Sequence, residues 1–128
     1  MKLKIQQTNL EPIRRLLTYT DSEQMIAISD EDVDYLLDSA TTLSLQTSCG
    51  VNLKDALQKL DTQVLDCGKA VKAIFVVRCS QSYQLPGSEL SDLSQYINDN
   101  LPRADVRWGF SIMDESEANV TVVAATTY

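Results

Sequence analysis

The sequence has 128 residues, a formal net charge of −7 and no histidine. A chain of this length fits one domain and can bury roughly two thirds of the surface that its unfolded form exposes. The acidic surplus argues against nucleic acid and anionic membranes as partners, because both attract clustered Lys and Arg. No run of about 20 apolar residues follows the N-terminus, so we expect no signal peptide, no membrane span and a cytoplasmic, bacterial-type setting.

Three cysteines, Cys49, Cys67 and Cys79, form no Cys-x-x-Cys pair. An odd count without a close pair predicts no disulfide framework. A catalytic cysteine is usually activated by histidine, and zinc sites draw heavily on histidine, which this chain lacks. The sequence therefore predicts a protein that is not an enzyme and holds neither a metal nor a cofactor.

The sequence fits neither an EF-hand calcium loop nor a phosphate-binding loop. Asp30, Asp32 and Asp34 fit the first alternate positions of an EF-hand loop. The turn glycine of that loop would then fall at Tyr35 and its bidentate glutamate at Thr41. Phosphate-binding loops need closely spaced glycines, and the four glycines here are far apart. We expect a helix start at the acidic run and no nucleotide bound by the chain on its own.

Residues 1–28 form an N-terminal arm with the least regular pattern. Residues 2–6 predict a short strand, residues 11–19 a short helix with Pro12 in its first turn, and residues 24–28 an extended stretch. The arm carries more apolar residues than a free tail would. We expect it to cover either its own domain or a second copy, with a dimer favoured.

From Ser29 onward the capping residues and the apolar periodicity are clearer, and we expect residues 29–128 to form the domain itself. Ser29 and the acidic residues after it predict a helix start over 30–40. Residues 43–47 alternate like a half-buried strand, and Asn52 caps a second helix that runs to Gly68. The next segment, residues 71–77, is nearly continuous in apolar and β-branched side chains, as in a central strand.

Ser88 opens a third predicted helix, which Pro102 stops. Residues 105–112 and 119–126 each alternate and are joined by an acidic loop, so they predict a β-hairpin. The predicted fold is α+β: a two-layer sandwich of a mixed four-stranded sheet with helices on one face. The core expected from the hairpin and the helices consists of Val106, Trp108, Phe110, Val122, Ala124, Leu57, Leu60, Leu93 and Ile97.

The last four predicted elements are strand 71–77, a helix, a strand reading ADVRWGFSIMD and a strand reading NVTVVAATT. In this order they resemble the C-terminal domain of the FtsZ family. These are the tubulin-like GTPases of bacterial cell division. The matching points are Gly109, Asp114 and the closing run 120–126, with Thr127 in place of the family's final glycine. The resemblance covers about residues 25–128. It implies an FtsZ C-terminal-domain-like fold, a small α+β fold comparable to the chorismate mutase type.

The resemblance also places Asp32 on an acidic position of the family at a helix start. In the family such residues act on GTP held by the next subunit. Ala27 and Ser29 stand where the family has its asparagine and first aspartate, so we expect Asp32 to act chiefly at the helix N-terminus. Only 28 residues precede Ser29. The chain therefore looks like a stand-alone second domain without the glycine-rich GTP-binding half.

The leading expectation is a non-catalytic protein-interaction or self-assembly module, associated with a tubulin-like division GTPase or filament. The alternative is a small-molecule-binding enzyme with its site between the subunits of a closed oligomer. In that alternative Arg78, Arg103 or Arg107 would clamp a carboxylate, which suits guanidinium geometry. A surface ion pair with an acidic residue is the simpler role for each arginine.

Overall fold

The computed structural model describes residues 2–18, 23–83, 87–113 and 118–128. Its strands are β1 (Lys2–Lys4), β2 (Glu23–Ile26), β3 (Thr42–Gly50), β4 (Lys72–Ser80), β5 (Asp105–Met113) and β6 (Val120–Thr127). Its helices are α1 (Glu11–Thr18), α2 (Asp30–Leu37), α3 (Leu53–Gln58) and α4 (Gly87–Asn100), with a 3-10 turn, η1 (Ile5–Gln7). The strands form one six-stranded sheet in the order β1-β3-β6-β4-β5-β2. The pair β4–β5 is parallel and the other pairs are antiparallel.

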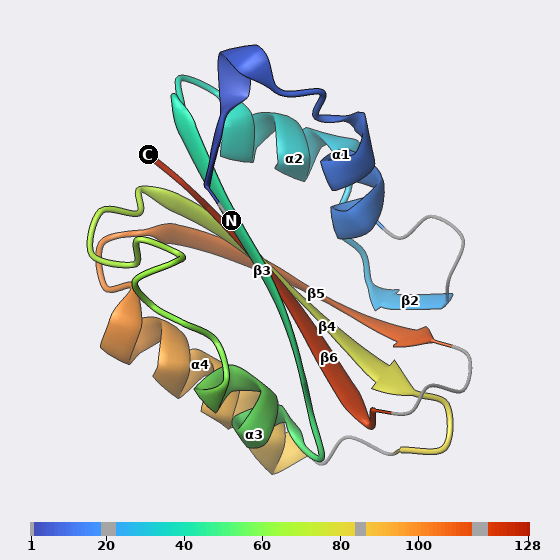
Figure 1. Ribbon diagram of the computed structural model, residues 1–128. Helices are drawn as coiled ribbons and strands as arrows, with labels where there is room; N and C mark the ends of the chain where they lie inside the picture. The colour runs from blue at the N-terminus through green and yellow to red at the C-terminus, as the bar shows by residue number, and fades with distance from the viewer. Residues whose placement is uncertain (1, 19–22, 84–86, 114–117) are drawn as a thin grey trace.

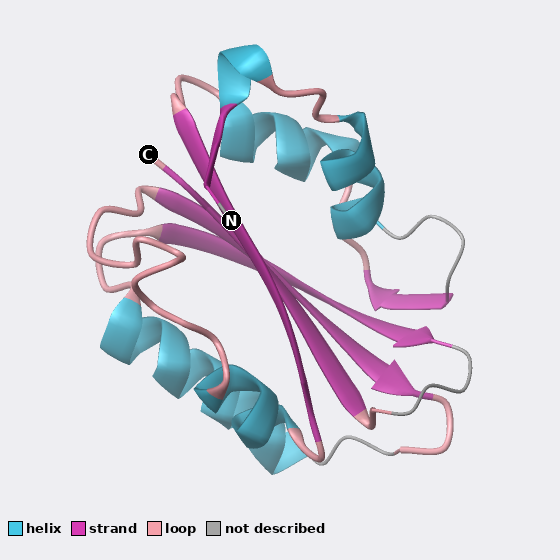
Figure 2. Ribbon diagram, in the orientation of Figure 1, coloured by secondary structure: helices cyan, strands magenta, loops and turns pink. Residues whose placement is uncertain are grey.

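Helices cover both faces of this sheet (Figures 1 and 2). α3 and α4 lie on one face, whereas α1 and α2 lie on the other. Strand β4 contributes buried side chains to both faces of the sheet. Phe75 packs in the α3–α4 cluster, whereas Ile74 and Val76 pack in the α1–α2 cluster. Two separate apolar cores therefore hold the helical layers to the sheet.

The α+β class and the mixed four-stranded sheet with helices on one face are confirmed in β3, β6, β4 and β5, covered by α3 and α4. The structure adds β1 and β2 at the two edges and a second helical layer, so three layers stand where two were predicted. The continuous apolar run in β4 explains the third layer. A strand without a polar face must be covered on both sides.

The predicted hairpin of the last two strands is wrong. β4 lies between them, with Val76 opposite Gly109 of β5 and Val123 of β6. Helix α4 carries the chain from β4 to β5 as a parallel crossover, which leaves the other side of β4 for β6. Alternation in a strand identifies its buried face, but it does not identify the neighbouring strand.

The residues predicted for the core nevertheless share one cluster. Val122 and Ala124 are fully buried, and Val106, Trp108 and Phe110 are half-buried against the same α3–α4 core. The sequence pattern therefore predicted correctly which side chains of β5 and β6 face the core.

The second predicted helix is shorter than expected, because α3 ends at Gln58. The side chain of Asp61 accepts hydrogen bonds from the backbone N–H groups of Gln63 at 2.8 Å and Val64 at 3.3 Å. This local bonding competes with continuation of a helix. The following chain still buries Leu60 and Leu65 in the α3–α4 core.

The described part of residues 1–28 packs on its own domain. β1 pairs with the start of β3, and β2 pairs with the end of β5. Between them, α1 buries Ile13 and Leu17 in the α1–α2 core. Within the described residues, none of the helices has the length and apolar character needed to cross a membrane.

Candidate functional site

Ser29 is the N-cap residue of helix α2, as predicted. Ser29 Oγ accepts the backbone N–H of Asp32 at 3.2 Å, and Asp32 Oδ2 accepts the backbone N–H of Ser29 at 2.9 Å. This reciprocal arrangement is a capping box, and it satisfies N–H groups that a helix N-terminus would otherwise leave without partners. Asp32, the acidic position singled out from the sequence, thus lies in the first turn of α2 with one oxygen occupied.

The other oxygen of Asp32 is occupied as well. Nη1 of Arg107, on β5, donates to Asp32 Oδ1 in a partly buried ion pair. Burial alone would raise the pKa of Asp32, but the hydrogen bonds from Ser29 and Arg107 outweigh it and hold the pKa below its ordinary value. The carboxylate is therefore ionised at neutral pH and fixed on both sides.

Tyr35 links Arg107 to a second cation. The centroid of its ring lies 4.2 Å from Arg107 Cζ and 4.3 Å from Lys72 Nζ, which is cation–π distance. The Tyr35 hydroxyl donates to Asp105 Oδ2 at 2.6 Å, and this bond raises the pKa of Tyr35. Lys72 Nζ also donates to the carbonyl oxygens of Tyr35 and Asp38, at 2.9 and 3.0 Å. We name this group the Tyr35 cluster: Asp32, Tyr35, Lys72, Asp105 and Arg107.

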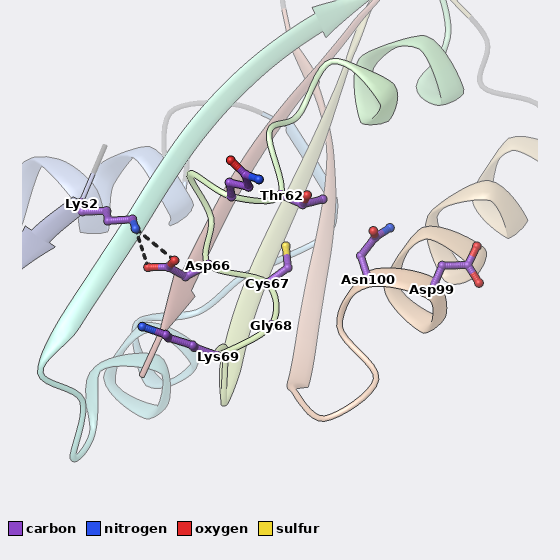
Figure 3. Close-up of a pocket in the computed structure, with 9 residues that line it drawn as sticks. Lys2, Thr62, Asp66, Cys67, Gly68, Lys69, Asp99 and Asn100 are labelled. Atoms are coloured by element: carbon purple, nitrogen blue, oxygen red, sulfur yellow. Dashed lines mark hydrogen bonds and ion pairs between the residues drawn. The ribbon is translucent and has the colours of Figure 1, made fainter.

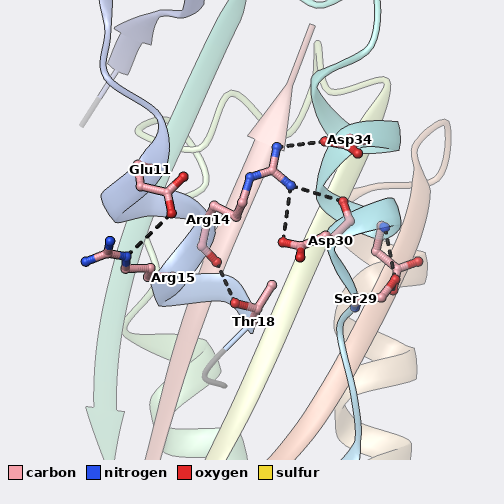
Figure 4. A network of polar contacts seen from close by, with 8 residues as sticks. Glu11, Arg14, Arg15, Thr18, Ser29, Asp30 and Asp34 are labelled. Carbon is pink, nitrogen blue, oxygen red and sulfur yellow. Dashed lines mark hydrogen bonds and ion pairs between the residues drawn. The ribbon is translucent and has the colours of Figure 1, made fainter. Parts of the chain in front are cut away.

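The neighbouring acidic residues of α2 face a different arginine (Figure 4). Arg14, on α1, bonds Asp30 at 3.3 Å and Asp34 at 2.7 Å. The carboxylates of Asp30, Asp32 and Asp34 therefore do not gather around one point, as an EF-hand loop requires. In the part of the chain that the structure describes, no group of three metal-ligating side chains is found.

The three arginines considered for a carboxylate clamp lie apart within one chain. Arg107 pairs with Asp32, Arg78 on β4 donates to Ser111 Oγ at 3.3 Å, and Arg103 is exposed in the turn before β5. The residue opposite Arg107 on β4 is Ile74, four positions before Arg78 and so roughly 13 Å away along the strand. Arg78 and Arg107 therefore do not lie side by side on the sheet, and a carboxylate clamp between subunits stays a prediction.

Gly109, one of the residues that match the FtsZ pattern, is required by the packing around it in this chain. A Cβ atom there would lie 2.8 Å from Ile28 Cγ1 and 2.9 Å from the carbonyl oxygen of Ile26. The segment from β2 to α2 thus crosses β5 at a place where only glycine leaves room. Asp114, the other single matching point, lies outside the described residues.

Sequence reasoning missed Tyr35, Lys72 and Asp105 as parts of one site. A partial signal was present, since Tyr35 follows Asp32 by three positions and shares its helix face. Asp105 and Arg107 likewise alternate onto one face of a strand. The two pairs meet only through the long-range packing of α2 on β5, and Lys72 joins them because the β4–β5 register sets it opposite Asp105.

No family model matches the sequence, and no curated protein matches it either. Among solved structures, an empty FtsZ dimer from M. jannaschii superposes with a TM-score of 0.67 at 19% identity, covering 83% of this chain and 32% of that one. CetZ2 from Haloferax volcanii, as a GTPgS-bound protofilament, gives a TM-score of 0.52 at 14% identity, covering 79% and 34%. The chain thus spans about one third of the length of these proteins. It has the fold of an FtsZ-like C-terminal domain.

Proposed function

We propose that this chain is a non-catalytic interaction module that associates with a tubulin-like GTPase or its filament through the face carrying the Tyr35 cluster. The observation that carries the proposal is the occupied carboxylate of Asp32. The resemblance aligns Asp32 with acidic residues that act, in the FtsZ family, on GTP held by the next subunit. Here Ser29 donates twice to Oδ2 and Arg107 donates to Oδ1, so the carboxylate is held by contacts within its own chain before any partner arrives.

The fold supports an association role. The two solved structures described above are assembled forms, one a dimer and the other a protofilament. The four glycines of this chain are too widely spaced for a phosphate loop, so we expect it to bind no nucleotide by itself. The expected cellular setting is the cell-division apparatus of a bacterial cytoplasm.

The composition of the face also supports binding to a protein. Tyr35 is exposed, with cationic groups against its ring. Tyrosine and arginine are enriched among the residues that contribute most to binding at protein interfaces. Asp32 and Asp105 hold Arg107 and Tyr35 in place before any partner arrives, which lowers the entropy lost on association.

Co-sedimentation with the tubulin-like GTPase of the same cell, polymerised with GTP, tests the proposal. We expect the chain to pellet with the polymer, to hydrolyse no GTP alone and to leave the polymer's GTPase rate without stimulation. Tyr35→Ala should abolish pelleting. The matched control Lys54→Ala, on the exposed side of α3 on the other face of the sheet, should pellet normally.

Two results would contradict the proposal. If the chain stays in the supernatant at every polymer concentration, the association role is wrong. If the chain accelerates GTP hydrolysis and Asp32→Asn removes that acceleration, Asp32 is catalytic and the module is not passive.

A further inference from the structure

One edge of β3 is paired over only part of its length. β3 spans Thr42–Gly50, whereas β1, its neighbour on that side, pairs with residues 42–44. β1 is anchored at this place, because Lys2 Nζ lies 2.9 Å from Asp66 Oδ2 (Figure 3). Figure 1 shows β3 running on past β1 toward α3. Among the described strands, none lies beside the second half of β3 on this edge.

Thr47 and Cys49 direct their backbone groups toward this side. Thr42 and Tyr128 exchange both backbone hydrogen bonds, at 3.1 and 3.2 Å, and the register of β3 with β6 continues unshifted from there. Because bonded residues alternate along an antiparallel strand, the odd-numbered residues of β3 point away from β6. The carbonyl oxygen of Cys49 accepts Lys59 Nζ at 3.2 Å. Within the described part of the chain, the N–H and C=O groups of Thr47 and the N–H group of Cys49 have no hydrogen-bond partner. We call these three groups the open edge.

The open edge has none of the features that usually keep strand edges from pairing. Such features are charged side chains, proline and bulges. β1 carries two lysines, Lys2 and Lys4, whereas residues 45–49 of β3 read Leu-Gln-Thr-Ser-Cys. The pairing of β3 with β6 contains no bulge, and the side chains of Thr47 and Cys49 are exposed. An extended segment can therefore approach the open edge.

A pocket of about 260 Å³ adjoins the open edge. It is lined by Cys49, Gly50, Val51, Lys59, Ala118 and Asn119. That volume is below the usual range of small-molecule sites, about 300–1,000 Å³, and suits a single side chain. When a segment adds to a sheet edge, backbone hydrogen bonds supply affinity and pockets for alternate side chains supply specificity. The open edge and this pocket together form a surface suited to an added strand.

The charges beside the open edge are mainly acidic. Asp61 lies next to β3, with its backbone N–H donating to Gln46 Oε1 at 2.7 Å, and Asp55 accepts the backbone N–H of Val51 at 3.1 Å. Lys59 compensates Asp55, at 3.2 Å, but Asp61 has no ion-pair partner among the described residues. The whole chain has a formal net charge of −7. A second copy would therefore bring like charges together, whereas a basic segment would be attracted.

We propose that the open edge binds an extended, basic segment of a partner protein, which adds to the sheet as a strand beside β3. The backbone of this segment bonds the N–H and C=O groups of Thr47 and the N–H group of Cys49, and one of its side chains enters the adjoining pocket. β1 already occupies the same side of β3 in this manner over residues 42–44. The surface is separate from the Tyr35 cluster, whose residues belong to α2, β4 and β5.

Titration of the full chain with the end-blocked peptide Lys-Thr-Val-Thr-Val-Thr-Lys, followed by amide chemical shifts, tests this assignment. We expect the amides of Thr47 and Cys49 to shift and to exchange with solvent more slowly. The same peptide with every internal amide N-methylated keeps its charge and side chains but cannot pair as a strand. It should bind at least about tenfold more weakly, since two or more hydrogen bonds are lost. A counterpart with glutamate in place of both lysines should bind at least about threefold more weakly at low salt.

Variants of the open edge give the second measurement. Thr47→Pro removes an N–H group that points away from β6, so the pairing of β3 with β6 stays intact and binding of the lysine peptide should weaken about fivefold or more. The matched control Thr47→Val keeps the N–H group and should bind normally. If Thr47→Pro does not fold, the N-methylated peptide on the wild-type chain decides alone.

Three results would overturn the proposal. The lysine peptide may leave the Thr47 and Cys49 amides unshifted, or its N-methylated or glutamate counterpart may bind equally well. Without peptide, shifts of these two amides that depend on protein concentration would show a second copy at the open edge instead of a partner segment. None of these results bears on the Tyr35 cluster, so the association role proposed for that face is judged separately.

Discussion

Arg107 on β5 forms an ion pair with Asp32 in the first turn of α2 and thereby ties the second helical layer to the sheet. The two residues are 75 positions apart in the sequence. The Asp32 side chain is only 20% exposed, so solvent screens this pair less than an exposed one. Since Asp32 also belongs to the capping box, its ionisation supports both the helix start and the contact between layers.

The variant Asp32→Asn should lower the free energy of unfolding by about 1 kcal/mol at neutral pH. Asparagine keeps an oxygen for the backbone N–H of Ser29 but offers no charge to Arg107. The pKa of Asp32 is lower in the folded chain than its ordinary value of 3.8. Its stabilisation is therefore complete above that value and disappears as the pH falls through the folded pKa. Urea unfolding at neutral pH and near pH 3 should show the difference between the two proteins shrinking at the acidic pH.

The control for this experiment is Asp92→Asn on α4, where no ion pair of the side chain is found among the described residues. Its free energy of unfolding should stay within about 0.5 kcal/mol of the wild type at both pH values. A loss for Asp32→Asn that is the same at both pH values would show that the charge of Asp32 contributes nothing.

Gly109→Ala should destabilise the chain by about 1–3 kcal/mol, because the added Cβ would overlap Ile28 Cγ1 and the carbonyl oxygen of Ile26. The carbonyl belongs to the backbone, so the segment from β2 to α2 has to move. The matched control is Gly68→Ala, where nothing lies within 4 Å of the new Cβ and the effect should be below about 1 kcal/mol. Thermal unfolding of both variants gives the comparison. Equal midpoints would show that the β2–α2 segment does not cross Gly109 this closely.

The parts of the fold that depend on neighbouring residues were predictable. The capping box needs only Ser29 and Asp32, three positions apart, and the structure has it. The apolar faces of the strands were assigned correctly as well, because a period of two follows directly from strand geometry. These features require no knowledge of which elements lie side by side.

The parts that depend on strand order were not predictable from local pattern. Trp108 was expected in a hairpin with the last strand, whereas it lies opposite Phe75 of β4. The contact of Lys72 with Tyr35 likewise depends on how α2 lies over β4. Long-range pairing of this kind is decided by the whole set of strands and crossovers, and no short window of sequence contains it.

The fluorescence of Trp108, the single tryptophan, should report its half-buried position. Its ring packs on the α3–α4 core from β5, which has only the short strand β2 outside it. We expect native emission to be blue-shifted from that of free tryptophan, but less than for a fully buried indole, and to move to the red in urea. An emission maximum equal to that of free tryptophan in native buffer would mean that Trp108 faces solvent, and with it the whole register of β5 would be inverted.

The last prediction concerns the N-terminal arm. Leu17 on α1 is completely buried in the α1–α2 core, whereas its neighbour Leu16 is only partly buried. Leu17→Ala should therefore lower the free energy of unfolding by about 2–5 kcal/mol, and Leu16→Ala by about 1 kcal/mol. Both changes have the same effect on helix propensity, so the difference between them measures burial alone. Urea unfolding at two widely separated protein concentrations completes the test. Because α1 packs on its own domain, the unfolding midpoints should not change with concentration, whereas an arm packed on a second copy would raise them as concentration increases. Equal losses for the two variants would mean that α1 is not anchored through Leu17.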